Sequence, residues 1–263
     1  MKKIIKYIKL WWIMTTHVSE IALSSRFGAA IFILGKLLRF AFFGIFLLLL
    51  IVKTKNIAGY NIWEIILFFM TFNLIDTGAQ FLWREVYRFR DYILSGNFDY
   101  FLTKPMSPLF RSLFGGSDIL DVVLLFLSVA FIGIAMQHIS GITFFAVFLY
   151  ILFVLNAFVI ALSFHILILS MGILTTEIDS ALWIYRDLTQ MGRIPVDVYK
   201  QPFQTVLTFV IPIAIMMTFP GKVVIGALSI SVIFISFLFG AGLFYSAIKF
   251  WEYALRFYVS ASS

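Results

Sequence analysis

The chain has 263 residues, of which 62% are hydrophobic, 19% are aromatic and 13% are charged. An average soluble domain is about half apolar and a quarter charged, so this composition excludes an ordinary water-soluble protein and indicates a membrane protein. The absence of cysteine excludes disulfides, thiolate metal sites and cysteine nucleophiles. A single domain covering residues 1–263 is expected, because a helical membrane protein of this length has room for about five to seven spans.

The first 25 residues are predicted to form an amphipathic helix at the membrane surface. Lysines fall on one helical face, and isoleucines fall on the other together with Trp11 and Trp12. A cationic helix with tryptophans at its apolar edge is typical of a helix that lies in the lipid headgroup plane. A soluble basic tail is the alternative, which the wide apolar face disfavours. The lysines are Lys2, Lys3, Lys6 and Lys9.

Six stretches are apolar and long enough to cross a bilayer as helices. The fourth has 32 residues without a charge. As a straight helix it would measure about 48 Å against a hydrocarbon core of about 30 Å, so it must tilt, bend or project from the membrane. Pro212 predicts a kink in the fifth. The predicted spans cover residues of about 30–52, 62–83, 109–136, 142–173, 203–219 and 223–248.

Lysine and arginine are distributed unevenly between the two sides that these spans define. Six spans place both termini on one side, together with the 84–111 and 175–202 connections. This side carries seventeen of the 20 basic residues and the opposite side three. The positive-inside rule therefore places both termini in the cytosol. The net charge of +7 indicates topology and attraction to anionic membrane lipid, and no nucleic-acid partner is expected.

The connection between the second and third spans reads SGNFDYFLTKPMSPLF over residues 95–110. Gly96 can end the preceding helix, and Asn97 is predicted to cap a short new helix. Lys104-Pro105 ends this helix, and Ser107-Pro108 begins the next span. The helix is expected to display four apolar side chains at the cytosolic surface as a docking site, although folding back onto the headgroups is an open alternative. These side chains are Phe98, Tyr100, Phe101 and Leu102.

The second span carries four polar residues at spacings of 3, 4 and 4, which places them on one helical face. We interpret them as a polar seam that lines a pathway or an interface between two subunits. A structural hydrogen-bond network with another helix is the alternative. Asp118 and Asp121 are expected to cap the third span or to pair with arginines, and His165 is interpreted as a packing residue. The seam residues are Asn73, Asp76, Gln80 and Arg84.

Three segments, in order along the chain, resemble the ABC-2 family of transporter permeases. The 95–110 connection is similar to the segment between the second and third spans of that family, with Lys104 where arginine is more usual, which keeps the charge but loses a bidentate fork. The matching residues there are Gly96, Asp99, Leu102, Lys104-Pro105 and Ser107-Pro108-Leu109-Phe110. The other two segments match through Arg193, Pro195, Tyr199, Pro212 and Pro220, and through Trp251, Leu255-Arg256, Tyr258 and Ser260-Ala261-Ser262.

This resemblance implies an all-α integral membrane fold of six transmembrane helices, with an N-terminal interfacial helix and a cytosolic coupling helix between spans two and three. It implies the permease subunit of an ABC exporter in the bacterial cytoplasmic membrane, working by ATP-driven alternating access with a second permease copy or paralogue. The permease would have no catalytic residue, metal or cofactor of its own, and a separate cytosolic ATPase subunit would bind ATP and Mg. The sequence agrees in lacking a G-x-x-x-x-G-K-[ST] motif. The residues that would contact the ATPase are Gly96, Phe98, Asp99, Tyr100, Phe101, Leu102, Lys104 and Pro105.

Two other classes of function are disfavoured. A secondary transporter driven by an ion gradient could use Asp76 and His165, but it would need paired intramembrane carboxylates or internal repeats, and the sequence shows neither. A membrane-embedded enzyme would need histidines and carboxylates clustered at one depth, whereas the three histidines are scattered along the chain.

Overall fold

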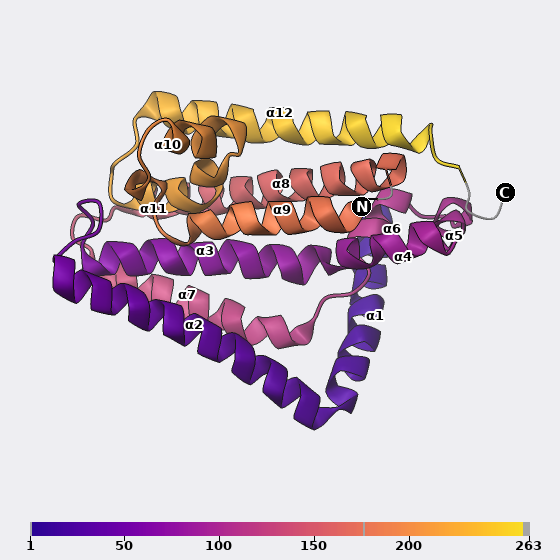
Figure 1. The fold of residues 1–263 in the computed structure, drawn as a ribbon, viewed down its shortest axis with the longest axis horizontal. Coiled ribbons are helices and arrows are strands. Elements are labelled where there is room, and N and C mark those ends of the chain that lie inside the picture. The colour runs from indigo at the N-terminus through magenta and orange to yellow at the C-terminus, as the bar shows by residue number, and fades with distance from the viewer. Residues whose placement is uncertain (1, 176, 260–263) are drawn as a thin grey trace.

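The structure is a computed structural model that describes residues 2–175 and 177–259. Within these residues the chain is helical, and its only extended pairing is one antiparallel bridge between Ile57 and Tyr60. The long helices lie side by side in a bundle, and α1 runs across one end of it (Figure 1). We name the end that holds both chain termini the basic end, and the opposite end, which holds the 55–61 turn, the far end (Figure 1). The predicted all-α fold is confirmed.

The N-terminal part consists of α1 (Lys2–Ser24) and α2 (Arg26–Thr54), which meet at a sharp corner (Figure 1). Ser25 separates them and caps α2 through its hydroxyl. α1 coincides with the predicted interfacial helix, and the side chains of Lys2 and Lys3 lie outside the described part of the chain. Its apolar face is exposed, as a helix in the headgroup plane requires. The exposed residues include Ile4, Ile5, Ile8 and Trp12.

The central helix is α3 (Ile62–Trp83), which coincides with the second predicted span. It begins with a capping box, in which the Asn61 side chain accepts from backbone N–H groups and the Glu64 carboxylate accepts from the Asn61 N–H at 2.8 Å. Its side chains are mostly buried, because helices pack around it on several sides. The chain then narrows into a 3₁₀ helix, η1 (Arg84–Arg88), and continues as α4 (Phe89–Leu94).

Two short helices, α5 (Phe98–Thr103) and α6 (Pro108–Leu113), form the connection at the basic end. Gly96 ends α4 in the left-handed region with φ 72°, and Ser107 caps α6, both as predicted. The predicted side-chain cap of α5 by Asn97 is wrong. Its backbone already has helical angles, and its amide donates to the serine two residues earlier, at 2.8 Å.

The third predicted span, 109–136, is not one continuous helix. After α6 the chain breaks at 114–118, makes a short 3₁₀ turn, η2 (Ile119–Asp121), and only then enters α7 (Val122–His138). The break has a physical cause. Gly115 passes directly against a buried carboxylate of η1, and a Cβ atom at this position would overlap that carboxylate. The chain therefore bends around a buried charge before it starts the long helix.

The longest helix, α8 (Phe144–Thr175), packs antiparallel to α12 (Ile230–Leu255) (Figure 1). Asn156 joins them by donating from its side-chain amide to the Ser236 carbonyl at 3.1 Å. α8 coincides with the long fourth predicted span. α12 begins later than the predicted 223–248 span, because the residues before it belong to a separate short helix.

The segment predicted as a cytosolic connection, 175–202, instead runs the length of the bundle. From the basic end, α9 (Ile178–Gln190) returns between α8 and α3, and the chain continues through η3 (Met191–Arg193) and η4 (Val196–Val198) to the far end (Figure 1). Sequence patterns did not predict this helix, because α9 is short and carries charges, so it has no uncharged run of the expected length.

The fifth predicted span, 203–219, does not traverse the bundle. Asp197 at the far end accepts hydrogen bonds from Gln204 at 3.2 Å and from Lys222 at 2.7 Å, so the segment ends at the level where it began. Its two arms are bent by 81° around Pro212, where the sequence predicted a kink. The segment consists of α10 (Phe203–Thr205), the π-helical turns η5 (Val206–Val210) and η6 (Ala214–Thr218), and α11 (Phe219–Val224).

In the described part of the chain, five helices are long and apolar enough to cross a membrane, and the bent segment would be a sixth if it were counted as one span. With α9 as a traverse, fourteen Lys and Arg residues belong to the basic end by sequence. Arg186 and Arg193 lie on the traverse itself, between the ends. The charge asymmetry is retained, because the far end has only Lys53, Lys55, Lys200 and Lys222.

Candidate functional site

The short helix predicted between spans two and three is present as α5, but only half of its four apolar side chains are exposed. Tyr100 is 64% exposed and Leu102 is 42% exposed, and Lys104 and Pro105 beside them are also exposed. Phe98 and Phe101 are buried, so the prediction that they lie at the surface is wrong. The two rings are three residues apart and share the inward face of the helix. We name the exposed residues Tyr100, Leu102, Lys104 and Pro105 the coupling face.

Phe98 joins α5 to the C-terminal end of α12. Its ring makes edge-to-face contacts with Phe89 at 5.2 Å, Tyr258 at 5.0 Å and Trp251 at 6.4 Å between centroids. The Tyr258 hydroxyl donates to the Asp99 carboxylate at 2.9 Å. Burial, together with the neighbouring Asp99, raises the pKa of Tyr258 to about 12, so the phenol stays protonated at neutral pH and remains a hydrogen-bond donor. The 95–110 connection and the C-terminal segment, two of the three segments that resemble the ABC-2 family, thus contact each other.

Beneath α5, a buried carboxylate collects three partners. Glu85 is 1% exposed, and it accepts from Arg111 at 2.6 Å, Tyr92 at 2.6 Å and Arg88 at 3.3 Å. The Arg111 guanidinium also lies over the Phe101 ring, 4.7 Å from its centroid. Sequence patterns did not predict that Glu85 is buried. The adjacent glycines at 115–116, within an expected helix, were the available signal of a close approach.

The N-terminal helix α1 also contacts the connection. The Lys6 ammonium donates to the Pro105 carbonyl at 3.0 Å, and the Ser107 N–H donates to the Tyr7 hydroxyl at 3.0 Å. The Tyr7 ring lies 4.5 Å from that of Phe110. α5 is therefore connected to α1, to η1 and α6, and to the end of α12.

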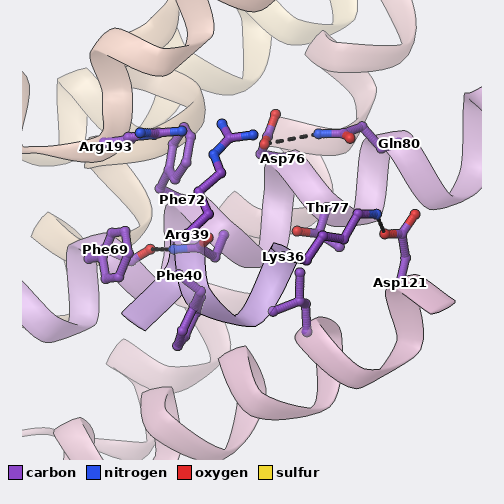
Figure 2. Close-up of a pocket in the computed structure, with 12 residues that line it drawn as sticks. Lys36, Arg39, Phe40, Phe69, Phe72, Asp76, Thr77, Gln80, Asp121 and Arg193 are labelled. Carbon is purple, nitrogen blue, oxygen red and sulfur yellow. Dashed lines mark hydrogen bonds and ion pairs between the residues drawn. The ribbon is translucent and has the colours of Figure 1, made fainter. Parts of the chain in front are cut away.

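The predicted polar seam on α3 faces a cavity. Asn73, Asp76 and Gln80 line a narrow space of about 60 Å³, and Gln80 and Arg84 line a wider one of about 530 Å³ toward the basic end. The Gln80 amide donates to Asp76 at 3.0 Å, and the Asn73 amide donates to the Phe69 carbonyl one turn earlier at 2.7 Å. Figure 2 shows Asp76 and Gln80 of the seam, together with Lys36, Arg39 and Arg193. The structure therefore brings the four seam residues to one wall of the cavity.

The opposite walls are basic. α2 contributes Lys36 and Arg39, and the traverse through α9 and η3 contributes Arg186 and Arg193. The Arg193 guanidinium lies over the Phe72 ring at 5.7 Å, and Arg39 reaches toward Asp76 (Figure 2). We name this space the basic cavity, lined by Lys36, Arg39, Asn73, Asp76, Gln80, Arg84, Arg186 and Arg193 among others.

Two acids at the edge of this cavity pair with its cations. Arg84 contacts Asp118 at 2.5 Å and Asp121 at 3.6 Å, and Lys36 forms an ion pair with Asp121. Asp118 also caps η2 by accepting from a backbone N–H at 3.0 Å. The expectation that these aspartates cap the helix or pair with arginines is confirmed, with Lys36 as an additional partner.

His165 is a packing residue, as interpreted from the sequence. It is 1% exposed, its Nδ1 bonds to the Ala161 carbonyl at 2.7 Å, and its ring contacts Trp83 and Tyr185. Among the described residues, no three histidines, cysteines or carboxylates are grouped so that they could hold a metal ion.

The family model for the ABC-2 family transporter protein matches residues 37–262, which is most of the chain and includes the connection, most residues of the basic cavity and α12. The chain belongs to the ABC-2 family of transporter proteins. It is thus a multi-pass membrane protein and the permease subunit of an ABC transporter, a type of subunit that is generally not an enzyme and works with an ATPase. The Ser260-Ala261-Ser262 part of the resemblance lies outside the described residues. Neither the curated proteins nor the solved structures give a match.

Proposed function

We propose that this ABC-2 permease crosses a bacterial cytoplasmic membrane six times, with both termini and the coupling face in the cytosol. The support is the basic end, to which fourteen of the 20 Lys and Arg residues belong, against four at the far end. In this arrangement α9 with η3 and η4 is the fifth crossing. The bent segment around Pro212 enters the membrane from the outside and returns to the same side.

The coupling face is proposed as the surface that a separate cytosolic ATPase subunit contacts. The supporting observation is that α5 presents Tyr100 and Leu102 outward, while Phe98 and Phe101 anchor it to several elements of the bundle. Exposed aromatic and aliphatic side chains on a rigid support are typical of interface anchors. ATP and Mg would be bound by that partner, and this chain would bind neither. Of the residues 96–105 predicted to contact the ATPase, the coupling face would touch it directly and the buried members would hold the face in place.

A movement of α5 would be transmitted to the membrane-spanning helices through the contacts of α5 and the residues next to it. The Asp99–Tyr258 hydrogen bond and the Phe98–Trp251 contact lead to α12, the Arg111–Glu85 pair leads to α6 and η1, and Lys6 leads to α1. Closure of two ATPase subunits would then rock two permease subunits, identical or paralogous, between inward-open and outward-open states. The polar seam and the basic cavity would lie on the exporter's substrate pathway.

The test is a double substitution on the coupling face, Tyr100→Ala with Leu102→Ala, in the permease reconstituted with its ATPase. The expected result is a loss of permease-stimulated ATP hydrolysis of about tenfold or more, because removing two anchors costs about 2 kcal/mol or more of contact energy. Protein yield and helicity should remain those of the wild type, because both side chains are exposed.

The matched control is Tyr245→Ala with Leu238→Ala, whose side chains are 64% and 63% exposed but lie in the middle of α12 and not in the connection. It should leave stimulation unchanged. Phe98→Ala is unsuitable as a test of contact, because emptying a fully buried ring site costs about 3–5 kcal/mol of stability. Wild-type stimulation in the coupling-face variant would contradict the proposed contact.

A further inference from the structure

The basic cavity holds more positive than negative charge. Its salt bridges of 4 Å or less pair Lys36 and Arg84 with the aspartates at its edge. Within the described part of the chain, no such bridge is formed by Arg39, Arg186 or Arg193, and Asp76 is the carboxylate that they surround. Three guanidinium groups around one carboxylate leave an excess of positive charge. Uncompensated charge at membrane depth is costly and is usually balanced by a partner or a ligand.

The narrow and wide parts of the basic cavity lie next to each other. Its narrow part, beside Asp76 and Arg193, and its wide part, beside Arg84 and Arg186, share Lys36, Arg39 and Gln80 in their walls. A ligand group that enters the wide part could thus reach the guanidinium groups of both α2 and the α9 traverse. Guanidinium groups bind phosphate and carboxylate oxygens through paired N–H donors.

An apolar groove continues from the narrow part toward the far end. It has a volume of about 260 Å³, lies between α2 and α3, and is lined by apolar residues throughout, including Gly44, Leu47 and Met70. Phe40 and Phe69 line both this groove and the narrow part of the basic cavity. α2 diverges from α3 toward the basic end (Figure 1), and both spaces lie between these two helices. The two spaces therefore adjoin at Phe40 and Phe69, and we name them together the cleft, which is cationic at one end and apolar at the other.

We propose that this cleft binds an anionic amphiphile, with its phosphate or carboxylate headgroup against Arg39 and Arg193 and its hydrocarbon tail in the α2–α3 groove. The charge excess selects an anionic headgroup over a zwitterionic one, and the adjoining apolar groove selects a tailed molecule over a free anion. The proposal deepens the proposed function, because in an exporter this amphiphile would be the cargo or a resident lipid. Binding itself does not depend on that function.

The experiment uses the purified full-length chain in nanodiscs of phosphatidylcholine, without any ATPase. Equilibrium binding is measured for radiolabelled hexadecyl phosphate, hexadecylphosphocholine and inorganic phosphate. Hexadecyl phosphate should bind at least about tenfold more tightly than either of the others, since each lacks one of the two complementary parts. The measurement is then repeated in nanodiscs that contain the anionic lipid phosphatidylglycerol. If phosphatidylglycerol competes with hexadecyl phosphate, the cleft binds a membrane lipid; if it does not compete, the cleft binds a different amphiphile.

Two variants change the two ends of the cleft separately. Arg39→Gln with Arg193→Gln should weaken hexadecyl phosphate binding about tenfold or more. Gly44→Leu should also weaken it by filling the groove, and a Cβ at this position is tolerated because its nearest neighbour is 3.7 Å away. The control, Lys53→Gln with Lys249→Gln, removes two exposed cations elsewhere and should have no effect.

Wild-type affinity in the arginine variant or in the groove variant would overturn the proposal, as would equal binding of inorganic phosphate. This experiment measures binding to the permease alone, without an ATPase. Its outcome therefore does not depend on whether the coupling face contacts an ATPase, which the coupling-face experiment tests.

Discussion

Replacing Glu85 with alanine tests whether the buried carboxylate holds the connection at the basic end together. The substitution removes two short buried hydrogen bonds, to Arg111 and Tyr92, each of which contributes about 1.5–3 kcal/mol because the acceptor is charged. The Arg88 contact adds little, because its side chain is 49% exposed and screened by solvent. Arg111 is only 20% exposed and would lose its carboxylate partner, which brings the expected loss of stability to about 3–5 kcal/mol.

The assay is thermal unfolding of the purified protein in detergent, combined with ATPase stimulation in the reconstituted complex. Glu85→Gln is the comparison, since it keeps the side-chain shape and one acceptor oxygen, and it should lose less stability than Glu85→Ala. Glu252→Ala on α12 removes an acid that is 52% exposed and paired only one turn away, and it should cost less than about 1 kcal/mol. If Glu85→Ala unfolds at the same temperature as Glu252→Ala, the reasoning about the buried carboxylate is refuted.

Three further predictions concern the backbone path, the topology and the tail. Gly115→Ala should be destabilising because its Cβ would overlap the buried carboxylate, whereas Gly133→Ala, with open space around it, should be neutral or stabilising by up to about 1 kcal/mol in the same melting assay. If α9 with η3 and η4 crosses the membrane, residue 200 lies outside the cell, and a Lys200→Cys variant should react with a membrane-impermeant maleimide in intact cells. Reaction only after permeabilisation would contradict this crossing. The pKa of Tyr258 is raised on folding, so its bond to Asp99 stabilises fully below about pH 10 and is lost as the pH rises toward 12. The stability advantage of the wild type over Tyr258→Phe should therefore be constant at neutral pH and shrink over that range; an advantage that grows with alkaline pH would contradict it.

Sequence patterns predicted the parts of the fold that depend on local chemistry. Long, mainly apolar runs predicted α3 and α8 nearly to the residue, because long apolar helices need no information from their neighbours. Gly96 and Ser107 marked a helix end and a helix start through backbone and capping preferences, which act within a few residues. The seam of α3 was predicted as one face by spacing alone.

The parts that were mispredicted depend on distant contacts. α9 was not predicted because its charged residues lower its hydropathy. A helix inside the bundle can carry such charges when they line a cavity, as Arg186 does, and hydropathy cannot detect the cavity. Phe98 was expected at the surface because the rings that cover it, Trp251 and Tyr258, lie about 150 residues further along the chain. The burial of Glu85 could not be predicted for the same reason, because its main partner, Arg111, lies beyond the turn of the connection.

Site-specific cross-linking from the coupling face tests the central proposal most directly. The chain has no cysteine, so Tyr100→Cys introduces a single reactive thiol on an exposed position of α5, and Val52→Cys, which is 75% exposed near the far end, provides the control. With a short thiol-to-amine cross-linker in cells that express the full transporter, Tyr100→Cys should join the permease to its ATP-binding subunit, and Val52→Cys should not. An ATPase cross-link from Val52→Cys in place of Tyr100→Cys, or from neither position, would contradict the account.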